Sequence, residues 1–381
     1  MGINLNSLDK STWETHRFDK IASSISERIE PAESKIDRYI GLEHLEAESI
    51  HIKRFGTKSD VKGQKLKCYA GDIIFGKRRA YQRKAALVTE EAICSAHAFV
   101  LRANSDVIDP KLFPFFLHSD QFMDRAIDIS VGGLSPTINW GTLKEEEFLL
   151  PPKAQQAELA ELLWAMDEVV EGKNLILKRI DTFYERVLLD FFKADSKYKK
   201  LELGKLVNIK SGDSPSAFEF TTKENGYPFY KVKDLNASVK YQDYAKEWVK
   251  PIHSKVIFKG SVIFPKRGAA IMTNKVRITL EDCHVDTNTM ALFVYDQEIL
   301  SNEYLYYFLY FKKLYKIADT SQIPQINNVH INPYPIHLPP LSIQKIFVNQ
   351  LNEILGVREK NMINISSSKA LQNSIINQVF S

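Results

Sequence analysis

Cysteine is scarce in this chain of 381 residues, which holds only Cys68, Cys94 and Cys283. The three lie far apart, with no paired spacing that would bind zinc or build a disulfide scaffold, so a reducing compartment is expected. No apolar run approaches the ~20 residues that span a bilayer, and residues 1–6 have neither the basic nor the apolar region of a secretory signal. We therefore expect a cytoplasmic protein without a membrane partner.

Enzyme signatures are missing as well. The chain has no Gly-x-x-x-x-Gly-Lys-Ser/Thr phosphate loop, no Gly-x-Gly-x-x-Gly turn after a strand and no His-Glu-x-x-His helix. Residues 332–335, Asn-Pro-Tyr-Pro, are superficially similar to a methyltransferase motif but lack its second consecutive proline, so a structural turn is expected. Because the nine histidines are scattered without ligand spacing, we predict no catalytic residue, no metal site and no cofactor in this chain.

The net charge is small, since 51 Lys and Arg face 47 Asp and Glu, which leaves +4. This excludes a polybasic tail but not a nucleic-acid partner, because local clusters set the field that a phosphate backbone meets. With 44% hydrophobic and 26% charged residues, the composition is that of a globular protein. The length predicts two or three domains.

A long internal repeat is the most informative feature of the sequence. Four pairs of segments match in the same order and at nearly constant separation: 39–42 with 229–232, 71–78 with 260–267, 136–139 with 324–327, and 150–152 with 338–340. Colinear matches of this kind indicate a duplicated domain.

Each copy ends in Leu-Pro-Pro-x-x-x-Gln and a long segment with helical periodicity. Proline suits the first turn of a helix, so each Pro-Pro pair predicts a helix start. The apolar residues of the two segments follow a 3-4 spacing that predicts an antiparallel coiled coil; the alternative is that each helix packs on its own domain. The predicted seam consists of Leu159, Leu162, Met166, Val169, Ile176, Ile180 and Phe183 in the first segment and Val348, Leu351, Leu355, Met362 and Ile365 in the second.

The segments before the helices are rich in short β-like runs, such as 73–75, 99–101 and 262–264, broken by Gly, Asn, Asp and Pro. Aromatic runs at 112–117 and 304–309 predict buried helices. The predicted fold class is therefore α+β, with two pseudo-repeated mixed globules separated by two long helices. The expected boundaries are 1–152, 153–196, 197–340 and 341–381.

Basic residues gather after the repeated strand at 71–75 and again at 260–264. Such loops beside a rigid strand suit duplex DNA, because Arg bridges a phosphate or a guanine edge and Lys adds a mobile charge; the alternative is a solvated loop. Gly132 and Gly133 are expected to form a turn, with a backbone contact to phosphate as an alternative. The candidate DNA-binding residues are Lys77, Arg78, Arg79, Tyr81, Arg83 and Lys84 in the first copy and Lys266, Arg267, Lys275 and Arg277 in the second.

Two diverged globules, each closed by Leu-Pro-Pro-x-x-x-Gln and a long helix, with Gly-Asp-Ile-Ile-Phe before a Lys/Arg cluster, resemble the specificity subunit of type I restriction–modification enzymes. The resemblance covers essentially the whole chain. It implies that each globule is a target recognition domain that reads one half of a split site in double-stranded DNA. It also implies that the helices pair and dock two modification subunits, which bind S-adenosylmethionine and methylate adenine, and that two restriction subunits join in some complexes.

Carried over by position, the resemblance places the DNA contacts at Lys77, Arg78, Arg79 and Tyr81 and at Lys266 and Arg267. The second copy departs from the pattern, because Pro265 replaces Gly76 and 268–270 replace Arg79-Ala80-Tyr81. Two other functions stay open on the residues alone. One is a coiled-coil scaffold that binds proteins but reads no DNA sequence, and the other is a self-sufficient methyltransferase.

Overall fold

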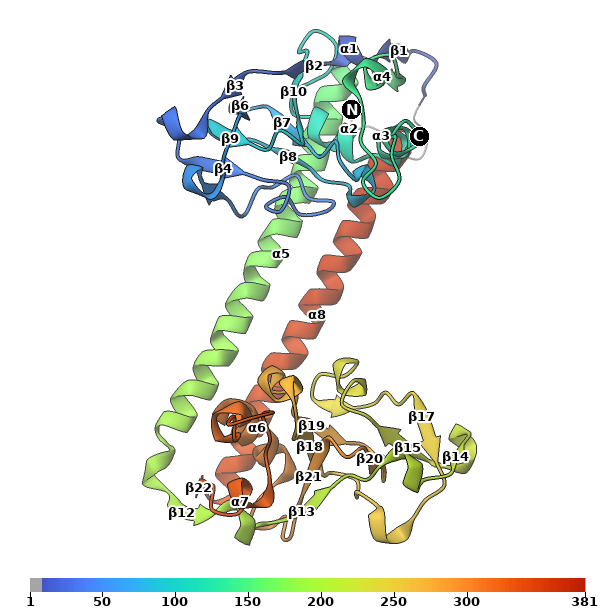
Figure 1. Cartoon of the computed structure of the whole chain (residues 1–381). Coiled ribbons are helices and arrows are strands. Elements are labelled where there is room, and N and C mark those ends of the chain that lie inside the picture. The colour runs from blue at the N-terminus through green and yellow to red at the C-terminus, as the bar shows by residue number, and fades with distance from the viewer. Residues whose placement is uncertain (1–8, 381) are drawn as a thin grey trace. The chain divides into compact units, whose positions relative to one another are not determined.

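The computed structural model describes residues 9–380 and divides into two compact units (Figure 1). The first unit comprises the residues up to Ile176 together with those from Asn361 onward, and the second comprises Leu177–Lys360. Each unit holds one globule and part of each of two long helices. We call residues 9–152 the first globule and residues 197–340 the second globule.

The first globule is built on two sheets. One has the strand order β2-β10-β7-β8 and the other β3-β6-β9-β4-β5, while β1 and β11 form a separate pair. The pairings are antiparallel except for β4 with β9, which are parallel. The strands are β1 (Glu14–Arg17), β2 (Ala22–Ile25), β3 (Arg28–Ile29), β4 (Arg38–Ile40), β5 (Gly56–Thr57), β6 (Lys65–Cys68), β7 (Ile73–Phe75), β8 (Ala85–Leu87), β9 (Ala92–Cys94), β10 (Phe99–Ala103) and β11 (Glu147–Leu150). The helices are α1 (Phe18–Ile21), α2 (Phe113–His118), α3 (Asp120–Asp128) and α4 (Trp140–Leu143).

The second globule repeats this plan. Its sheets have the orders β13-β21-β18-β19-β16 and β14-β17-β15-β20, and β12 pairs with β22. The parallel pair of the first globule recurs as β15 with β20. The strands are β12 (Lys199–Glu202), β13 (Val207–Ser211), β14 (Phe220–Thr221), β15 (Tyr227–Tyr230), β16 (Tyr241–Gln242), β17 (Glu247–Val249), β18 (Val262–Pro265), β19 (Arg277–Thr279), β20 (His284–Val285), β21 (Thr289–Val294) and β22 (Pro335–Leu338), and the helices are α6 (Asn302–Lys312) and α7 (Asn328–Ile331). The predicted α+β class is confirmed.

The two long helices are α5 (Lys153–Lys193) and α8 (Leu341–Phe380), and each begins directly after a Pro-Pro pair. Within the first unit they run antiparallel, since Gln372 Nε2 donates to Leu163 O at 3.4 Å and Lys173 Nζ to Ser368 Oγ at 2.6 Å. Within the second unit Arg358 Nε lies 2.6 Å from Asp181 Oδ1. Polar side chains thus contribute contacts between the helices in both units.

The buried face of α5 lies one position away from the predicted seam. Of the predicted residues, Leu159 is buried, but Val169, Ile176 and Phe183 are 52%, 50% and 55% exposed. The buried positions of α5 are Gln156, Leu159, Ala160, Leu163, Asp167, Val170, Tyr184, Leu188 and Phe192. The prediction missed this face because polar residues with partners, such as Asp167, interrupt it, whereas the neighbouring row that was predicted is apolar except at Lys173 and Asp190.

On α8 the predicted seam lies closer to the observed one. Val348, Leu351 and Ile365 are buried and Leu355 is half-buried, whereas Met362 is 45% exposed. Both helices also enter the globule cores. The core of the first globule takes Leu159, Leu163, Ile376, Val379 and Phe380 from the helices, and that of the second takes Tyr184, Leu188, Phe347, Val348 and Leu351. Such sharing explains why the helices do not form a compact unit of their own.

The glutamine of each Leu-Pro-Pro-x-x-x-Gln motif clasps its globule. Gln156 Oε1 accepts from Asp109 N at 2.6 Å, and its Nε2 donates to Val107 O and Pro151 O at 2.9 and 2.8 Å. Gln344 makes the same three bonds with Ser301 N, Ile299 O and Pro339 O. Both glutamines are buried. The repeated motif is therefore a main-chain clasp at the foot of each helix.

Candidate nucleic-acid interface

The first basic loop, residues 76–84, follows β7 and lies against a second segment, residues 130–137, which we call the first companion loop. Arg79 N donates to Pro136 O at 2.8 Å, and Ile138 N donates to Lys77 O at 2.9 Å. Arg78 and Thr137 also form an isolated β-bridge. These main-chain bonds hold the two loops together as one surface.

The second globule repeats this arrangement. Its second basic loop, residues 265–277, runs from the last residue of β18 to the first residue of β19, and its second companion loop is 319–325. Gly268 N donates to Pro324 O and Ile326 N to Lys266 O, both at 2.8 Å, and Arg267 forms a β-bridge with Gln325. The same pair of loops therefore stands at the same place in both copies.

Arg79 occupies a backbone conformation that few side chains adopt, with φ 54° and ψ 56°. The second basic loop has Gly268 at the matching place, with φ 78°. A residue other than glycine in the left-handed region costs on the order of 1 kcal/mol or more, and such positions gather at functional sites. Arg79 thus occupies a position where glycine would have less backbone strain. This favours a role for its guanidinium.

The candidate side chains divide into those that face outward and those that bond within the fold. Arg78, Arg79 and Arg267 are exposed, and Tyr81 is 54% exposed. Arg78 lies 3.5 Å from His97 Nε2. These residues present cations and one aromatic ring at the surface of the basic loops.

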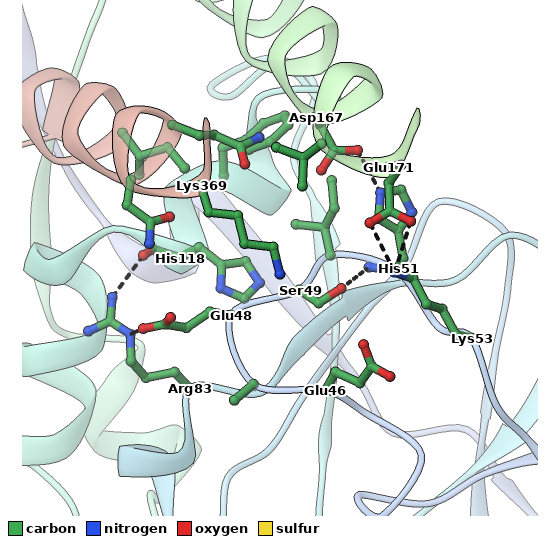
Figure 2. A pocket seen from close by; sticks show the side chains of 17 residues that line it. Glu46, Glu48, Ser49, His51, Lys53, Arg83, His118, Asp167, Glu171 and Lys369 are labelled. Carbon is green, nitrogen blue, oxygen red and sulfur yellow. Dashed lines mark hydrogen bonds and ion pairs between the residues drawn. The ribbon is translucent and has the colours of Figure 1, made fainter. Parts of the chain in front are cut away.

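Arg83 is turned inward to a pocket wall (Figure 2). Its guanidinium lies 3.4 Å from a carboxylate oxygen of Glu48 and 2.6 Å from one of Asp120, and it donates to His118 O at 3.0 Å. Burial lowers the pKa of the neighbouring His118 imidazole to about 4. Two neighbouring carboxylates already balance the Arg83 charge, so this residue supports the loop from inside.

Two further candidates bond to carbonyl oxygens of the protein. Lys84 Nζ donates to Leu42 O at 2.7 Å, and Arg277 donates to Leu235 O at 2.8 Å and to Val276 O at 2.7 Å. Burial lowers the pKa of Arg277. We therefore interpret both as residues that shape the basic loops.

The remaining lysines are half-buried at the roots of the loops. Lys77 Nζ lies 5.2 Å from the ring centroid of Phe99, a cation–π distance. Burial and then the adjacent arginine lower the pKa values of Lys77 and Lys266. Lys275 is also half-buried.

The companion loops were not among the predicted DNA-binding residues, although a phosphate contact at Gly132 and Gly133 was left open and residues 136–139 and 324–327 were recognised as repeated. Leu134 at the tip of the first companion loop is 98% exposed. Gly132 precedes it with φ 116°, a conformation that glycine adopts readily. Ile323 is likewise an exposed apolar residue in the second companion loop. The signal that would have found these loops was their recurrence at the same place in each copy.

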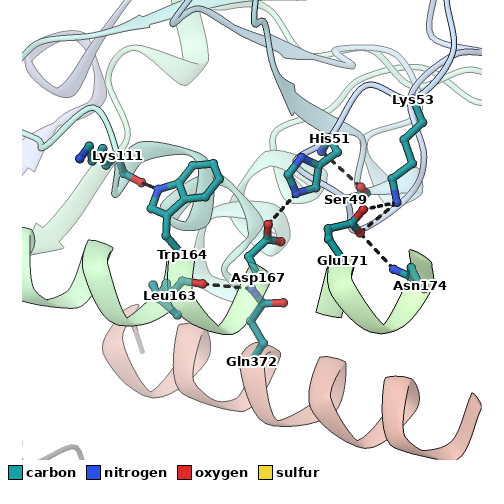
Figure 3. Close-up of polar contacts among 10 residues, drawn as sticks. All are labelled: Ser49, His51, Lys53, Lys111, Leu163, Trp164, Asp167, Glu171, Asn174 and Gln372. Carbon is teal, nitrogen blue, oxygen red and sulfur yellow. Dashed lines mark hydrogen bonds and ion pairs between the residues drawn. The ribbon is translucent and has the colours of Figure 1, made fainter. Parts of the chain in front are cut away.

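Polar contacts join the first globule to α5 (Figure 3). His51 Nε2 lies 2.6 Å from Asp167 Oδ2, and Lys53 Nζ lies 2.8 Å from Glu171 Oε2. Trp164 Nε1 donates to Lys111 O at 2.9 Å. Two ion pairs and one hydrogen bond thus fix the first globule on the helix that follows it.

The second globule uses different chemistry at its junction with α8. Lys240 Nζ is buried and lies 2.6 Å from Glu303 Oε1 and 2.6 Å from Asn352 Oδ1. Burial lowers the pKa of Lys240. Although burial raises the pKa of Glu303, hydrogen bonds from Lys240 and Tyr241 bring it below its ordinary value. The Lys240–Glu303 ion pair lies within the globule, and Asn352 on α8 is hydrogen-bonded to it.

Within residues 9–380, no group of three His, Cys, Asp or Glu side chains is arranged to hold a metal ion. Over the same residues, no helix has the length and apolar character needed to cross a bilayer.

Several relatives are similar in sequence. The specificity subunit of the type I restriction enzyme EcoDI from Escherichia coli is 26% identical over 191 residues, or 49% of this chain and 42% of that protein. The MjaIX specificity subunit from Methanocaldococcus jannaschii is 23% identical over 295 residues, or 69% of this chain and 66% of that protein. The chain thus spans less than two thirds of the length of both relatives.

Solved structures share the fold. A chain from a study of complex assembly and conformational transition in the type I R-M system has a TM-score of 0.67 at 20% identity, with 97% of each chain covered. The S subunit of a type I system from M. genitalium has a TM-score of 0.58 at 16% identity, with 98% of each chain covered. These likenesses show a common fold.

The family of the type I restriction modification DNA specificity domain matches this chain twice, at residues 11–181 and 195–361. The two matches correspond to the two copies seen in sequence and in structure, and together they cover most of the chain. The chain therefore belongs to the family of type I restriction–modification specificity subunits.

Proposed function

We propose that this chain is the DNA-binding specificity subunit of a type I restriction–modification complex, in which each globule reads one half of a bipartite target in duplex DNA. The observation that carries this proposal is the recurrence of a basic loop bonded to a companion loop in both globules. Arg78 and Arg79 in the first copy and Arg267 in the second stand outward on these loops. Arginine on a rigid loop reads guanine edges and binds phosphates bidentately.

The proposal assigns the helices two tasks, to set the spacer between the half-sites and to dock two modification subunits. Exposed apolar residues support the docking task in each unit. The first unit has Val169 and Ile176 on α5 and the second has Phe183. Exposed apolar rows on helices mark interaction sites more often than isolated residues do.

In this proposal the chain holds no catalytic residue and no cofactor. S-adenosylmethionine and adenine methylation belong to the modification subunits, and cleavage belongs to restriction subunits where the complex contains them. A scaffold without sequence-specific binding is the competing function. It differs in one measurable way, because it predicts no preference among DNA sequences.

The test is selection of binding sites from a randomised duplex library by the full chain assembled with its modification subunits. We expect a split consensus, whose binding weakens steeply as salt rises because phosphate contacts release counterions. Replacing residues 1–150 by the corresponding part of another specificity subunit should change one half of the consensus. No consensus at all would establish the scaffold, and a change in both halves would disprove independent reading.

The spacer has its own test. Removing one heptad from α5 together with the facing heptad of α8 should shorten the unread spacer in the selected sites, since about 1.5 Å of helix is lost per residue. An unchanged spacer would show that the helices do not set it.

A further inference from the structure

The first globule contains a hollow of about 550 Å³ where its two sheets meet. Its wall combines residues from β2, β3, β6 and β10, strands that are neighbours in Figure 1, with the root of the first basic loop and the start of α4. The lining residues used below are Ser24, Ser26, Arg28, Lys65, Lys77 and Trp140. Because most of them stand on or beside paired strands, the hollow is part of the rigid frame.

All charged side chains that line this hollow are cations. Arg28, Lys65 and Lys77 line it, and none of its lining residues is an aspartate or glutamate. Arg28 donates to Gln64 Oε1 at 3.2 Å and Lys65 donates to Gly63 O at 3.0 Å. These partners carry no formal charge, and no carboxylate of residues 9–380 forms an ion pair with Arg28, Lys65 or Lys77.

Neutral donors complete the lining. Ser24 and Ser26 bring hydroxyl groups. Trp140 brings an indole N–H, for which no described residue provides a hydrogen-bond acceptor, while its ring packs 6.0 Å from that of Phe99. Such a set of cations and neutral donors suits the oxygens of a phosphodiester.

The positive electrostatic potential of the hollow extends to the residues around it. The pKa of His97 lies below its ordinary value because of partial burial and then the nearby charges of Arg78, Lys77 and Lys65. Lys77 also belongs to the first basic loop. The hollow therefore continues the cationic surface of that loop onto β3 and β6.

We propose that this hollow binds the phosphate backbone of the first half-site, with Arg28, Lys65 and Lys77 as the cations that position the DNA. Neither Arg28 nor Lys65 was among the residues predicted from the sequence. The inference rests on the proposed function. It assigns affinity and register to the hollow and leaves base reading to the outward residues of the two loops, since contacts to phosphate position a duplex without reading it.

The test compares the double variant Arg28→Gln/Lys65→Gln with the wild type, each as the full chain assembled with its modification subunits. Binding to duplexes that carry the selected site is measured over a series of salt concentrations. We expect the slope of log affinity against log salt to become shallower by about two, one for each lost contact. The affinity should fall about tenfold for each contact, equally for selected and unrelated sequences.

The matched control is Lys20→Gln/Lys111→Gln, which removes the same charge from two exposed lysines of the same globule outside the hollow. Arg28→Lys/Lys65→Arg keeps the charge and should retain the wild-type slope. Melting temperature and binding of the modification subunits check that each variant is folded. Duplexes in which one phosphate is replaced by a neutral methylphosphonate then locate the contact. At a contacted phosphate, this replacement should lower the affinity of the wild type but not that of the Arg28→Gln/Lys65→Gln variant.

Each outcome decides the proposal. Equal slopes for the hollow and control variants would overturn it, and so would a changed preference at a base pair with an unchanged slope, which would make the hollow a base reader. If the wild-type complex selects no DNA sequence, the proposed function is wrong. That result comes from the wild type and does not depend on the variants of the hollow.

Discussion

His51 Nε2 lies 2.6 Å from Asp167 Oδ2, a contact that ties a loop of the first globule to the middle of α5. The hydrogen bond to Asp167 raises the pKa of His51 despite its partial burial. The pair thus makes the seating of this globule on its helix sensitive to pH.

We predict that His51→Gln lowers the stability of the protein at mildly acidic pH and has little effect at alkaline pH. A histidine whose folded pKa is raised stabilises fully below its ordinary pKa of ~6.5 and loses this stabilisation as the pH rises through the folded pKa. The expected loss at acidic pH is about 1 kcal/mol, since the pair is partly exposed. Melting curves of both proteins over the pH range measure it, with His253→Gln, an exposed histidine of the second globule, as the control. A difference that grows with pH would contradict the prediction.

Substitutions of Lys240 and Glu303 should have strongly non-additive effects on the free energy of unfolding. Lys240→Met leaves the partly buried Glu303 carboxylate without its cation, and breaking a buried pair in this way costs about 3 kcal/mol. Adding Glu303→Gln removes the unpaired charge, so the double variant should be more stable than Lys240→Met alone. Denaturant unfolding of the four proteins of this cycle gives the coupling energy, and strict additivity would show that the two side chains do not stabilise each other.

Arg79 and Arg83 should respond in opposite ways to the same substitution. Arg79→Gln removes an outward charge, so we expect weaker DNA binding by about 1–3 kcal/mol and an unchanged melting temperature. Arg83→Gln breaks the contacts with Glu48, His118 and Asp120, so we expect a lower melting temperature. Binding titrations and melting curves on both variants separate the roles, and equal losses in both assays would refute the division.

The exposed apolar residues of α5 should control how many modification subunits bind. Val169→Ser/Ile176→Ser in the first unit should release one of the two subunits and leave the other in place, because burying each of these side chains contributes roughly 1.5–3 kcal/mol. Phe183→Ser should weaken the other subunit. Mass measurement of the assembled complex counts the subunits. Glu168→Ser, an exposed polar position on the same helix, is the control and should keep both.

The sequence predicted most of the fold but only part of the interface. The α+β class, the duplication and the helix starts followed from patterns that act locally, such as Pro151-Pro152 and the apolar strand at 73–75. The face of α5 could not be predicted from hydropathy, because it includes Asp167, a buried carboxylate whose partner His51 lies far away in the chain.

The interface shows the same limit. The basic loops were visible as charge clusters, but the division between outward Arg79 and inward Arg83 depends on Glu48 and Asp120, which no local pattern places beside Arg83. The hollow at Arg28 and Lys65 brings together strands that are separate in the sequence. The sequence gives the sign of each charged side chain, whereas the partner of that side chain depends on tertiary structure.

The glutamine clasp has a consequence for how such proteins diversify. Gln156 and Gln344 bond only to main-chain groups of their globules, and main-chain groups are the same whatever side chains a globule carries. A globule with other surface side chains would still present the same two carbonyls and one amide. Substitution of the surface side chains of a globule should therefore leave its attachment to the helix unchanged.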